Sequence, residues 1–562
     1  MRDLWAPGAA LGAALYALLS GASRLAAGTP HTITLIATLW AAVATIPPLL
    51  LFTYVAGVRG RRLGGAASGG GWAALLLAAS AIGSAAALAP ADYDFREVLS
   101  KAYLFYDAQR SGHLGKRNRV PWRGDSALLD KGPAGQDLTG GFYDAGDHLK
   151  SAMSMGVAAS TLAWGLLEFP AAHERAGQAG IAAGQVRWAA EWLLKAHISD
   201  NELVAQAGDF GIDHAFWGRP EDLDAKVKKG EMTRPAYLIN ATHPGSDIAG
   251  EASAALAAAA KVFERSDPTF ARKCLEHSKT LYRFAKKYRG LAGESVPQLA
   301  LIYNSTAYRD DLAWAAAWLA LATGEPAYAT EAAGWLEEAW TAEKERWYYI
   351  VSNWNNMAWS AQLLLARLTS NPTYVKGTKD FLDSWRLGKH VHYSRKGLAF
   401  ADDWATLRNS ANAALIGLVY AKHVGPRAGA PYECWALSQL RYMLGDSGRS
   451  YVVGYGKHFP TQPHQRAASC PNAPAGCNYL QLHSPDPNPH VLVGALVGGP
   501  YRNDTFPDDR QNYAKSEVGI EYNAGFTAAA AGAAEAPTPW AACMQGGGLA
   551  NVVPRKLRRR GV

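Results

Sequence analysis

The spacing of apolar residues between Tyr93 and Ala536 predicts a body made almost entirely of helices. Apolar residues recur there at intervals of three and four, the period of an amphipathic α-helix, and Gly, Pro, Asn or Asp separates the runs. Alternating strand patterns are almost absent. The strongest segments begin at Asp247, Asp310, Asn356, Asp403 and Ser516, and weaker ones lie near 94–108, 151–169, 179–198, 268–289, 326–342, 372–386 and 431–445. Together they predict twelve helices.

Twelve helices in one domain predict the fold class all-α, with six helical hairpins packed around a common core as an (α/α)6 barrel. No short internal repeat is present, which disfavours a solenoid. The connections 109–150, 199–246 and 446–515 are too long for simple linkers, so we expect them to carry the functional site. The barrel is expected to occupy residues 91–537.

The first 90 residues follow a different pattern. Trp5 to Ala22, Ile33 to Val58 and Trp72 to Ala89 are apolar runs almost free of charge, each about long enough to cross a bilayer, which takes roughly 20 residues. The basic cluster at Arg59, Arg61 and Arg62 would stay cytoplasmic, which places everything after residue 90 on the outer or luminal side.

A secretory signal explains part of the same region. Residues 59–89 contain a basic segment, an apolar run and the small-residue sequence Ala87-Leu88-Ala89, which is typical of a cleavage site. Under this interpretation the helical body is secreted, and under the first it is anchored to a membrane. Both interpretations remain open, and both place the body outside the cytosol.

Composition and charge exclude a nucleic-acid partner. The chain carries 49% hydrophobic and 19% charged residues, enough for a large core. Its net charge of +8 comes from the basic amino-terminal region and from the tail at 538–562, which is of low complexity and basic, so the central body is near neutral. Its 19 Trp and 25 Tyr lie among acids rather than basic stripes, a pattern that suits neutral ring-shaped ligands.

The five cysteines include no CxxC pair, which makes a zinc site improbable. Cys470 and Cys477 can close a short loop, while Cys274, Cys434 and Cys543 are expected to be buried thiols. Sequons at Asn240, Asn304 and Asn503 are compatible with a secretory route.

The segment Gly140 to Lys150, GGFYDAGDHLK, is the strongest candidate site. Asp144 and Asp147 lie three residues apart among glycines, aromatics and a histidine, where a turn near helical geometry would direct both carboxyls to one cavity. Two adjacent carboxyls cannot ionise independently, and such a shifted pKa serves proton transfer. A calcium loop or a helix cap is the alternative explanation.

Several segments together resemble glycoside hydrolase family 9, the cellulases acting as endo-β-1,4-glucanases. They are the DAGD segment, HPGSDIAGEASAAL from His243, GLAFADDWATLRNSANAA from Gly397, SYVVGYGKHFPTQPHQR from Ser450, and SPDPNPHVLVGALVGGPYRNDTFPDDRQNYAKSEVGIEYNAGF from Ser484. They occur in the family's order from about Tyr93 to Ala536.

The resemblance implies roles for individual residues. Asp147 matches the general base, Asp144 the residue that helps to hold the attacking water, and Glu517 the general acid. His464 and Arg466 match substrate-binding residues. Glu517 is expected in the first turn of a helix, where the dipole would oppose its protonation, with burial by Tyr513 or Tyr522 prevailing. Glu521, one turn further on, is interpreted as a solvated surface charge.

Aromatic residues are candidates for the sugar subsites. Trp217, in a long connection, is favoured over the helical Trp314, since Trp in helices is more often core. Tyr522 is the second aromatic candidate for substrate binding. No cofactor or metal is implied; calcium occurs in some relatives, but no clear ligand loop is present.

The sequence therefore predicts an inverting endo-β-1,4-glucanase, a monomer whose partners are a β-glucan substrate and a membrane reached through the amino-terminal segments. Inversion needs an acid and a base on opposite sides of a sugar, roughly 6.5–9.5 Å apart, so they must come from different elements. Where the family has His and Asn, this chain has Gln465 and His458, which motivates the alternative of a weakly active or non-catalytic β-glucan-binding or wall-remodelling protein. An all-helical terpene cyclase with Asp-rich motifs is a further alternative.

Overall fold

The computed structural model describes residues 93–342, 351–386 and 388–545. The predicted amino-terminal spans, the signal-like segment 59–89 and the end of the basic tail lie outside these residues. Among the helices of the described ranges, none combines the length and apolar character needed to cross a bilayer.

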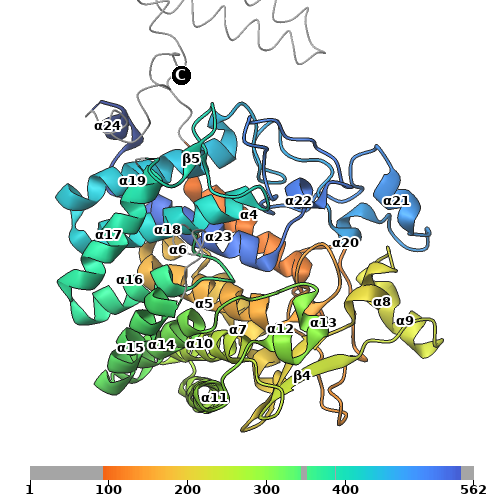
Figure 1. Cartoon of the computed structure of the whole chain (residues 1–562). Coiled ribbons are helices and arrows are strands. Elements are labelled where there is room, and N and C mark those ends of the chain that lie inside the picture. The colour runs from red at the N-terminus through yellow and green to blue at the C-terminus, as the bar shows by residue number, and fades with distance from the viewer. Residues whose placement is uncertain (1–92, 343–350, 387, 546–562) are drawn as a thin grey trace, which may run out of the picture. The chain divides into compact units, whose positions relative to one another are not determined.

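Six helices form a closed inner ring in which each contacts the next and the last contacts the first. They are α5 (Ala152–Glu168), α10 (Ser246–Phe263), α14 (Arg309–Thr323), α16 (Ala358–Thr369), α18 (Thr406–Val424) and α23 (Ile520–Glu535). A second helix packs against each of them from outside. The outer helices, given in the order of the inner helices that they cover, are α7 (Ala179–Ala196), α11 (Pro268–Lys287), α15 (Pro326–Ala342), α17 (Pro372–Arg386), α19 (Pro426–Arg441) and α4 (Phe95–Gln109) (Figure 1).

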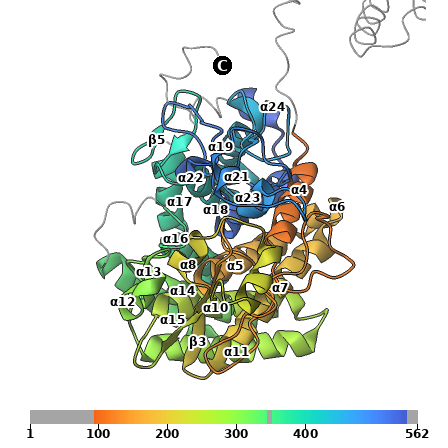
Figure 2. The same cartoon turned by 90° about the vertical axis from the view of Figure 1, so that its right-hand side faces the viewer.

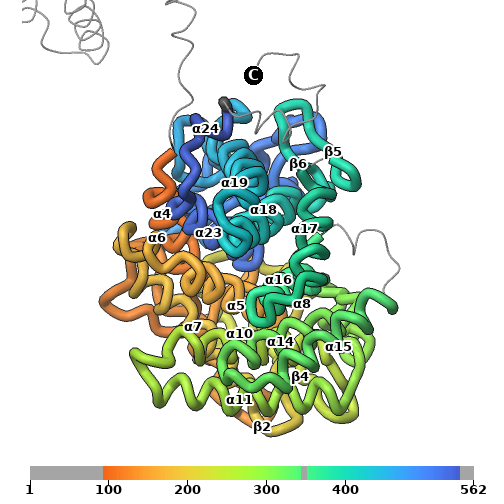
Figure 3. Tube along the Cα trace, turned by 90° about the vertical axis from the view of Figure 1, so that its left-hand side faces the viewer, coloured from red at the N-terminus to blue at the C-terminus, as the bar shows by residue number. Residues whose placement is uncertain are grey.

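The composition of each ring follows from its surroundings. The inner helix α10 is buried around its whole circumference from Ser246 to Ala260, largely through alanine, which lets neighbouring helices approach closely. The outer helix α11 buries one stripe and exposes the other. In Figure 3, α11 lies below α10 at the edge of the body. The twelve predicted helices and the double ring of an (α/α)6 barrel are thus confirmed.

The predictions missed short elements in the connections. Strands β1 (Lys150–Ser151), β2 (His197–Ser199) and β4 (Ala236–Asn240) each pair antiparallel with β3 (Glu202–Ala207), and β5 (His392–Tyr393) pairs with β6 (Ala399–Phe400). Strands β1, β2, β5 and β6 have only two or three residues, too few for alternation to appear, and β3 and β4 have no alternating burial. The remaining short elements are α6 (Pro170–Arg175), α8 (Phe210–His214), η1 (Pro220–Asp222), α9 (Leu223–Lys228), α12 (Ala292–Ser295), α13 (Pro297–Ala300), η3 (Tyr442–Asp446), α20 (Arg466–Ser469), α21 (Tyr479–His483), α22 (Tyr513–Ser516) and α24 (Trp540–Gln545).

The cysteines correct one prediction and confirm two. Cys470 and Cys477 form the expected disulfide, and Cys274 is a buried thiol. Cys434 and Cys543, predicted to be thiols, instead form a disulfide with each other. Because this bond joins α24 to α19, residues 540–545 belong to the folded body rather than to a low-complexity tail. A separation of 109 residues gives no sequence signal for the pairing.

Candidate active site

The three long connections meet at one end of the barrel, where α8, α21 and α22 lie (Figure 2). The first carries Asp144 and Asp147 in a segment of bends, so the turn is not helical as the spacing suggested. Asp144 is fixed by its backbone: its N–H donates to the Leu149 carbonyl at 2.9 Å, and its own carbonyl accepts from the Ile520 N–H at 2.9 Å. The second bond ties this loop to the start of α23.

The carboxyl group of Asp144 is buried and held by a tyrosine. The Tyr303 hydroxyl lies 2.8 Å from one carboxyl oxygen of Asp144 and 3.1 Å from the other. Burial, and then the charge of Asp147, raise the pKa of Asp144 to about 8. Near neutral pH Asp144 therefore carries a proton, so the two adjacent carboxyls do not hold two negative charges.

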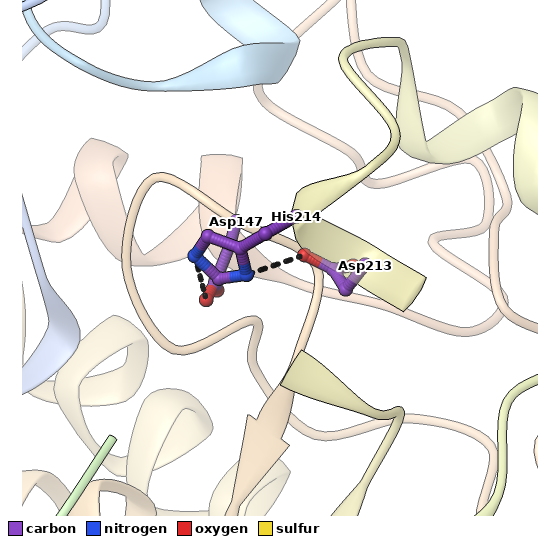
Figure 4. A group of neighbouring side chains, drawn as sticks. All are labelled: Asp147, Asp213 and His214. Carbon is purple, nitrogen blue, oxygen red and sulfur yellow. Dashed lines mark ion pairs between the residues drawn. The ribbon is translucent and has the colours of Figure 1, made fainter. Parts of the chain in front are cut away.

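Asp147 lies in a group of alternating charges. His214 Nε2 lies 3.9 Å from one Asp147 carboxylate oxygen, and His214 Nδ1 lies 3.8 Å from an oxygen of Asp213 (Figure 4). Burial and the charge of Asp213 raise the pKa of Asp147, while His214 and Arg466 oppose that rise. A carboxylate whose pKa is raised toward the working pH is suited to removing a proton from water.

The ligand-type atoms of Asp147, Asp213 and His214 all lie within 4.8 Å of one another, which is close enough for a divalent cation. However, Asp213 already pairs with Arg466, and a second guanidinium nitrogen, Arg234 Nη1, lies 3.9 Å from it. A cation would meet these two positive groups. The surroundings of Asp213 therefore do not favour a bound metal ion.

Glu517 comes from the far end of the chain and lies just outside a helix. It follows the last residue of α22, with φ −67° and ψ 152°, and α23 begins three residues later at Ile520. The prediction that it occupies the first turn of a helix is therefore wrong. Burial, and then the charges of Asp147 and Asp144, raise its pKa well above the usual value, as an acid catalyst requires.

Gly146 allows the two acidic segments to approach each other. A Cβ at this position would lie 2.3 Å from the His464 carbonyl oxygen, a distance that no side chain tolerates. The Arg466 N–H donates to the Gly146 carbonyl at 2.9 Å, and His464 pairs with Glu517 through a parallel β-bridge. One backbone segment, 464–466, therefore links the loop of Asp147 to the segment of Glu517.

His464 and Arg466 differ in charge and in their hydrogen-bond partners. His464 Nδ1 lies 2.6 Å from the Arg510 carbonyl, so Nδ1 carries the hydrogen and Nε2 is left as an acceptor. Burial lowers its pKa to about 4, which keeps the ring neutral. Arg466 is buried and pairs with Asp213, and it also donates to the Asp213 carbonyl at 3.1 Å.

The two aromatic candidates are largely buried. Trp217 donates its indole N–H to Ser469 Oγ at 3.0 Å and packs edge-on against His464, with ring centres 5.2 Å apart. Tyr522 accepts a hydrogen bond from the half-exposed Trp404 at 2.8 Å and lies under the guanidinium of Arg408. In this structure both residues support neighbouring side chains.

Glu521 is not the solvated charge that its position suggested. It is 2% exposed and accepts a hydrogen bond from Arg408 Nη1 at 2.7 Å. The reason is that α23 belongs to the inner ring, whose helices have no solvent face. Its negative charge also contributes to the raised pKa of Asp144.

Gln465, which replaces the family's histidine, has a structural role. Its side-chain amide donates to Gln109 at 3.0 Å and its carbonyl accepts from the Ala468 N–H at 2.6 Å, capping α20. It is 3% exposed, so the replacement alters the support of the loop rather than its surface.

Sequence reasoning missed Tyr303, Asp213 and His214. The sequence Asp213-His214-Ala215-Phe216-Trp217 repeats the mixture of acid, histidine and aromatics seen near Asp147, and this was the available signal. Tyr303 gave none, because only the fold brings it to Asp144.

The chain is similar to known proteins over most of its length. A family model for glycosyl hydrolase family 9 matches residues 95–530. Endoglucanase A of Bacillus pumilus is 41% identical over 78% of this chain, which spans 66% of that relative's length, and endoglucanase 24 of Oryza sativa is 37% identical over 86% of this chain and 94% of its own length. The structure of an endoglucanase from the termite Nasutitermes takasagoensis is similar with a TM-score of 0.75 and 44% identity, covering 79% of this chain and 99% of that one.

The double ring of helices, the buried acids at one end of it and these relatives together define a glycoside hydrolase. The chain belongs to glycosyl hydrolase family 9.

Proposed function

We propose that this protein is an endo-β-1,4-glucanase that cleaves internal bonds of cellulose or a related β-glucan with inversion. The raised pKa of Glu517, on a segment separate from that of Asp147 yet affected by its charge, is the observation that carries the proposal. The names of the family relatives support the substrate class.

In this mechanism Asp147 is the general base and removes a proton from the attacking water. Asp144, protonated near neutral pH and held by Tyr303, helps to orient that water. Glu517 donates its proton to the departing sugar oxygen, so no charged alkoxide has to leave. Water attacks from the face opposite the leaving group, which inverts the anomeric carbon.

Two neighbours maintain the charge of Asp147. They are His214 and Arg466, whose charges lower the pKa of Asp147 and so favour its ionised form. His464, neutral and with a free Nε2, is suited to accept a hydrogen bond from a sugar hydroxyl. Subsite contacts of Trp217 and Tyr522 belong to the same proposal, although both are mostly buried without substrate.

The location outside the cytosol is also proposed. Two disulfides in the described part of the chain support an oxidising compartment. The protein is either anchored by the amino-terminal apolar runs or secreted, and it acts as a monomer.

The decisive experiment follows the anomeric form of the first product by NMR during hydrolysis of a soluble cello-oligosaccharide. Inversion of a β bond gives the α-anomer first, and accumulation of the β-anomer would contradict the mechanism.

A second experiment measures reducing-sugar release from carboxymethylcellulose, because a protein that only binds the polymer releases none. The Asp147→Asn and Glu517→Gln variants should each lose about 10²–10⁴-fold in kcat. The control Glu264→Gln removes only a surface pair with Lys261 and should match wild type. Equal rates for all four proteins would leave only the binding alternative.

A further inference from the structure

Helix α11 concentrates positive charge on the outer ring of the barrel. It and the two residues after it carry Arg272, Lys273, Lys279, Arg283, Lys286, Lys287 and Arg289, against the single acid Glu276. Arg272, Lys279, Arg283 and Lys286 recur at helical spacing and therefore share one stripe of the helix. The central body of the chain is near neutral, so this concentration is local.

Part of this positive charge has no acidic partner. Lys279 pairs with Glu325 at 2.8 Å and Lys286 with Glu331 at 2.6 Å. Within the described ranges, no carboxylate lies within ion-pair distance of Arg283, Lys287 or Arg289. Compensation of the helix dipole accounts only for cations in the last turn, Lys286 and Lys287, because the effect is confined to that turn.

A hollow lies between α11 and α15 beside these cations. It has a volume of about 440 Å³ and is lined by Arg283, Lys286, Lys287, Arg289, Glu331, Gly334, Trp335 and Glu338. Gly334 adds no side chain to its wall. The hollow is shallow and open to solvent, and its volume is enough for one charged sugar-sized group.

The cations around the hollow lie on aromatic rings. The guanidinium of Arg289 lies 4.7 Å from the ring centre of Trp335, and the ammonium of Lys287 lies 4.9 Å from that of Tyr288. Such contacts limit the freedom of long side chains before any ligand arrives, which lowers the entropic cost of binding. The rings themselves are covered, so recognition here is by charge rather than by sugar stacking.

We infer that the outer face of α11 binds a carboxylate-bearing polysaccharide through the hollow between α11 and α15. In Figures 1 and 2, α11 lies along the lower edge of the body, away from α21 and α22, so the face and the active site belong to different surfaces. Carboxylates spaced along a polymer match the stripe of cations, which spans about 22 Å from Arg272 to Lys287 at about 1.5 Å per residue. Binding here holds the enzyme on an acidic glycan while the active site works on another chain.

The test measures retention of the whole protein on immobilised polygalacturonate and on a neutral polysaccharide at rising salt. Polygalacturonate is not a β-1,4-glucan, so retention is independent of the proposed activity. Wild type should bind the acidic matrix alone and elute with salt, since screening weakens charge pairing. The variant Arg283→Gln/Lys287→Gln/Arg289→Gln should bind at least about tenfold more weakly.

The matched control removes three exposed cations from scattered loops: Lys229→Gln/Lys389→Gln/Arg395→Gln. It has the same net charge as the α11 variant and should bind like wild type. Equal weakening of both variants would mean a nonspecific charge effect and would overturn the inference. So would equal retention of wild type on the neutral matrix, or tighter binding to anionic lipid vesicles or to single-stranded DNA. If the triple variant does not fold, as judged by circular dichroism, Arg283→Glu alone should still weaken binding several-fold, and wild-type binding by that protein would contradict the proposal.

Discussion

The backbone of His464 lies beside that of Glu517 in a parallel bridge, and the His464 N–H donates to the Ser516 carbonyl at 2.9 Å. Two residues further along, the Arg466 N–H donates to the Gly146 carbonyl. Two main-chain hydrogen bonds therefore fix the acid segment relative to the base loop. Backbone contacts of this kind do not depend on side-chain rotamers, so the spacing of the two backbone segments is set by the fold.

Gly146→Ala tests this close approach. The added Cβ would meet the His464 carbonyl oxygen at 2.3 Å, so one of the two segments must move. We expect destabilisation of about 1–3 kcal/mol by thermal melting, together with a fall in kcat. Gly184→Ala on α7 is the control, because nothing lies within 4 Å of its Cβ, and it should be neutral or stabilising. Wild-type kcat in Gly146→Ala would show that the spacing is not critical.

Asp144→Asn tests the electrostatic origin of the raised Glu517 pKa. Glu517 acts while protonated, so activity falls as pH rises through its pKa. The charge of Asp147, joined by that of Asp144 once Asp144 ionises near its own pKa of about 8, raises the pKa of Glu517. Asp144→Asn cannot ionise, so it must lower the Glu517 pKa on the alkaline side. The basic limb of the pH profile of kcat/KM should therefore move to lower pH, whatever the loss in absolute rate. A limb that stays in place, or moves upward, would show that burial alone sets the Glu517 pKa.

The Arg408 and Glu521 pair is expected to behave as a buried unit. Arg408→Met leaves the Glu521 carboxylate buried without its cation, which should cost about 3–5 kcal/mol in the free energy of unfolding. The double variant Arg408→Met/Glu521→Gln removes both charges and should recover much of that loss. Denaturant unfolding of the two single variants and the double variant gives the coupling energy. Additive losses would mean that the pair is not coupled.

Glu251 should make the protein less stable as pH rises. It is buried between α10 and α14 next to Asp311, and burial raises its pKa from 4.5 to about 8. Between these values the folded state binds more protons than the unfolded state, so the free energy of unfolding falls with pH, by up to about 1.4 kcal/mol per unit. The stability that Glu251 contributes is fully present below its unfolded-state pKa of 4.5. It is lost as the pH rises through its folded-state pKa of about 8.

Glu251→Gln removes this titration and should flatten the pH dependence of stability between pH 5 and 8. Denaturant midpoints at several pH values, compared with wild type, provide the measurement. Glu264→Gln, at an exposed site, is the control and should follow wild type. Parallel curves for wild type and Glu251→Gln would contradict the assignment.

The sequence by itself determined the twelve helices, the order of the family segments and the candidate acids Asp144, Asp147 and Glu517. Helical periodicity and spaced motifs are local properties, so they can be read along the chain. The tertiary structure alone decided what lies next to what: Tyr303 against Asp144, Arg408 against Glu521, and Cys434 bonded to Cys543. Glu521 shows the physical reason, since its position on α23 was predicted while its burial depended on α23 joining the inner ring, where every face of a helix meets another helix.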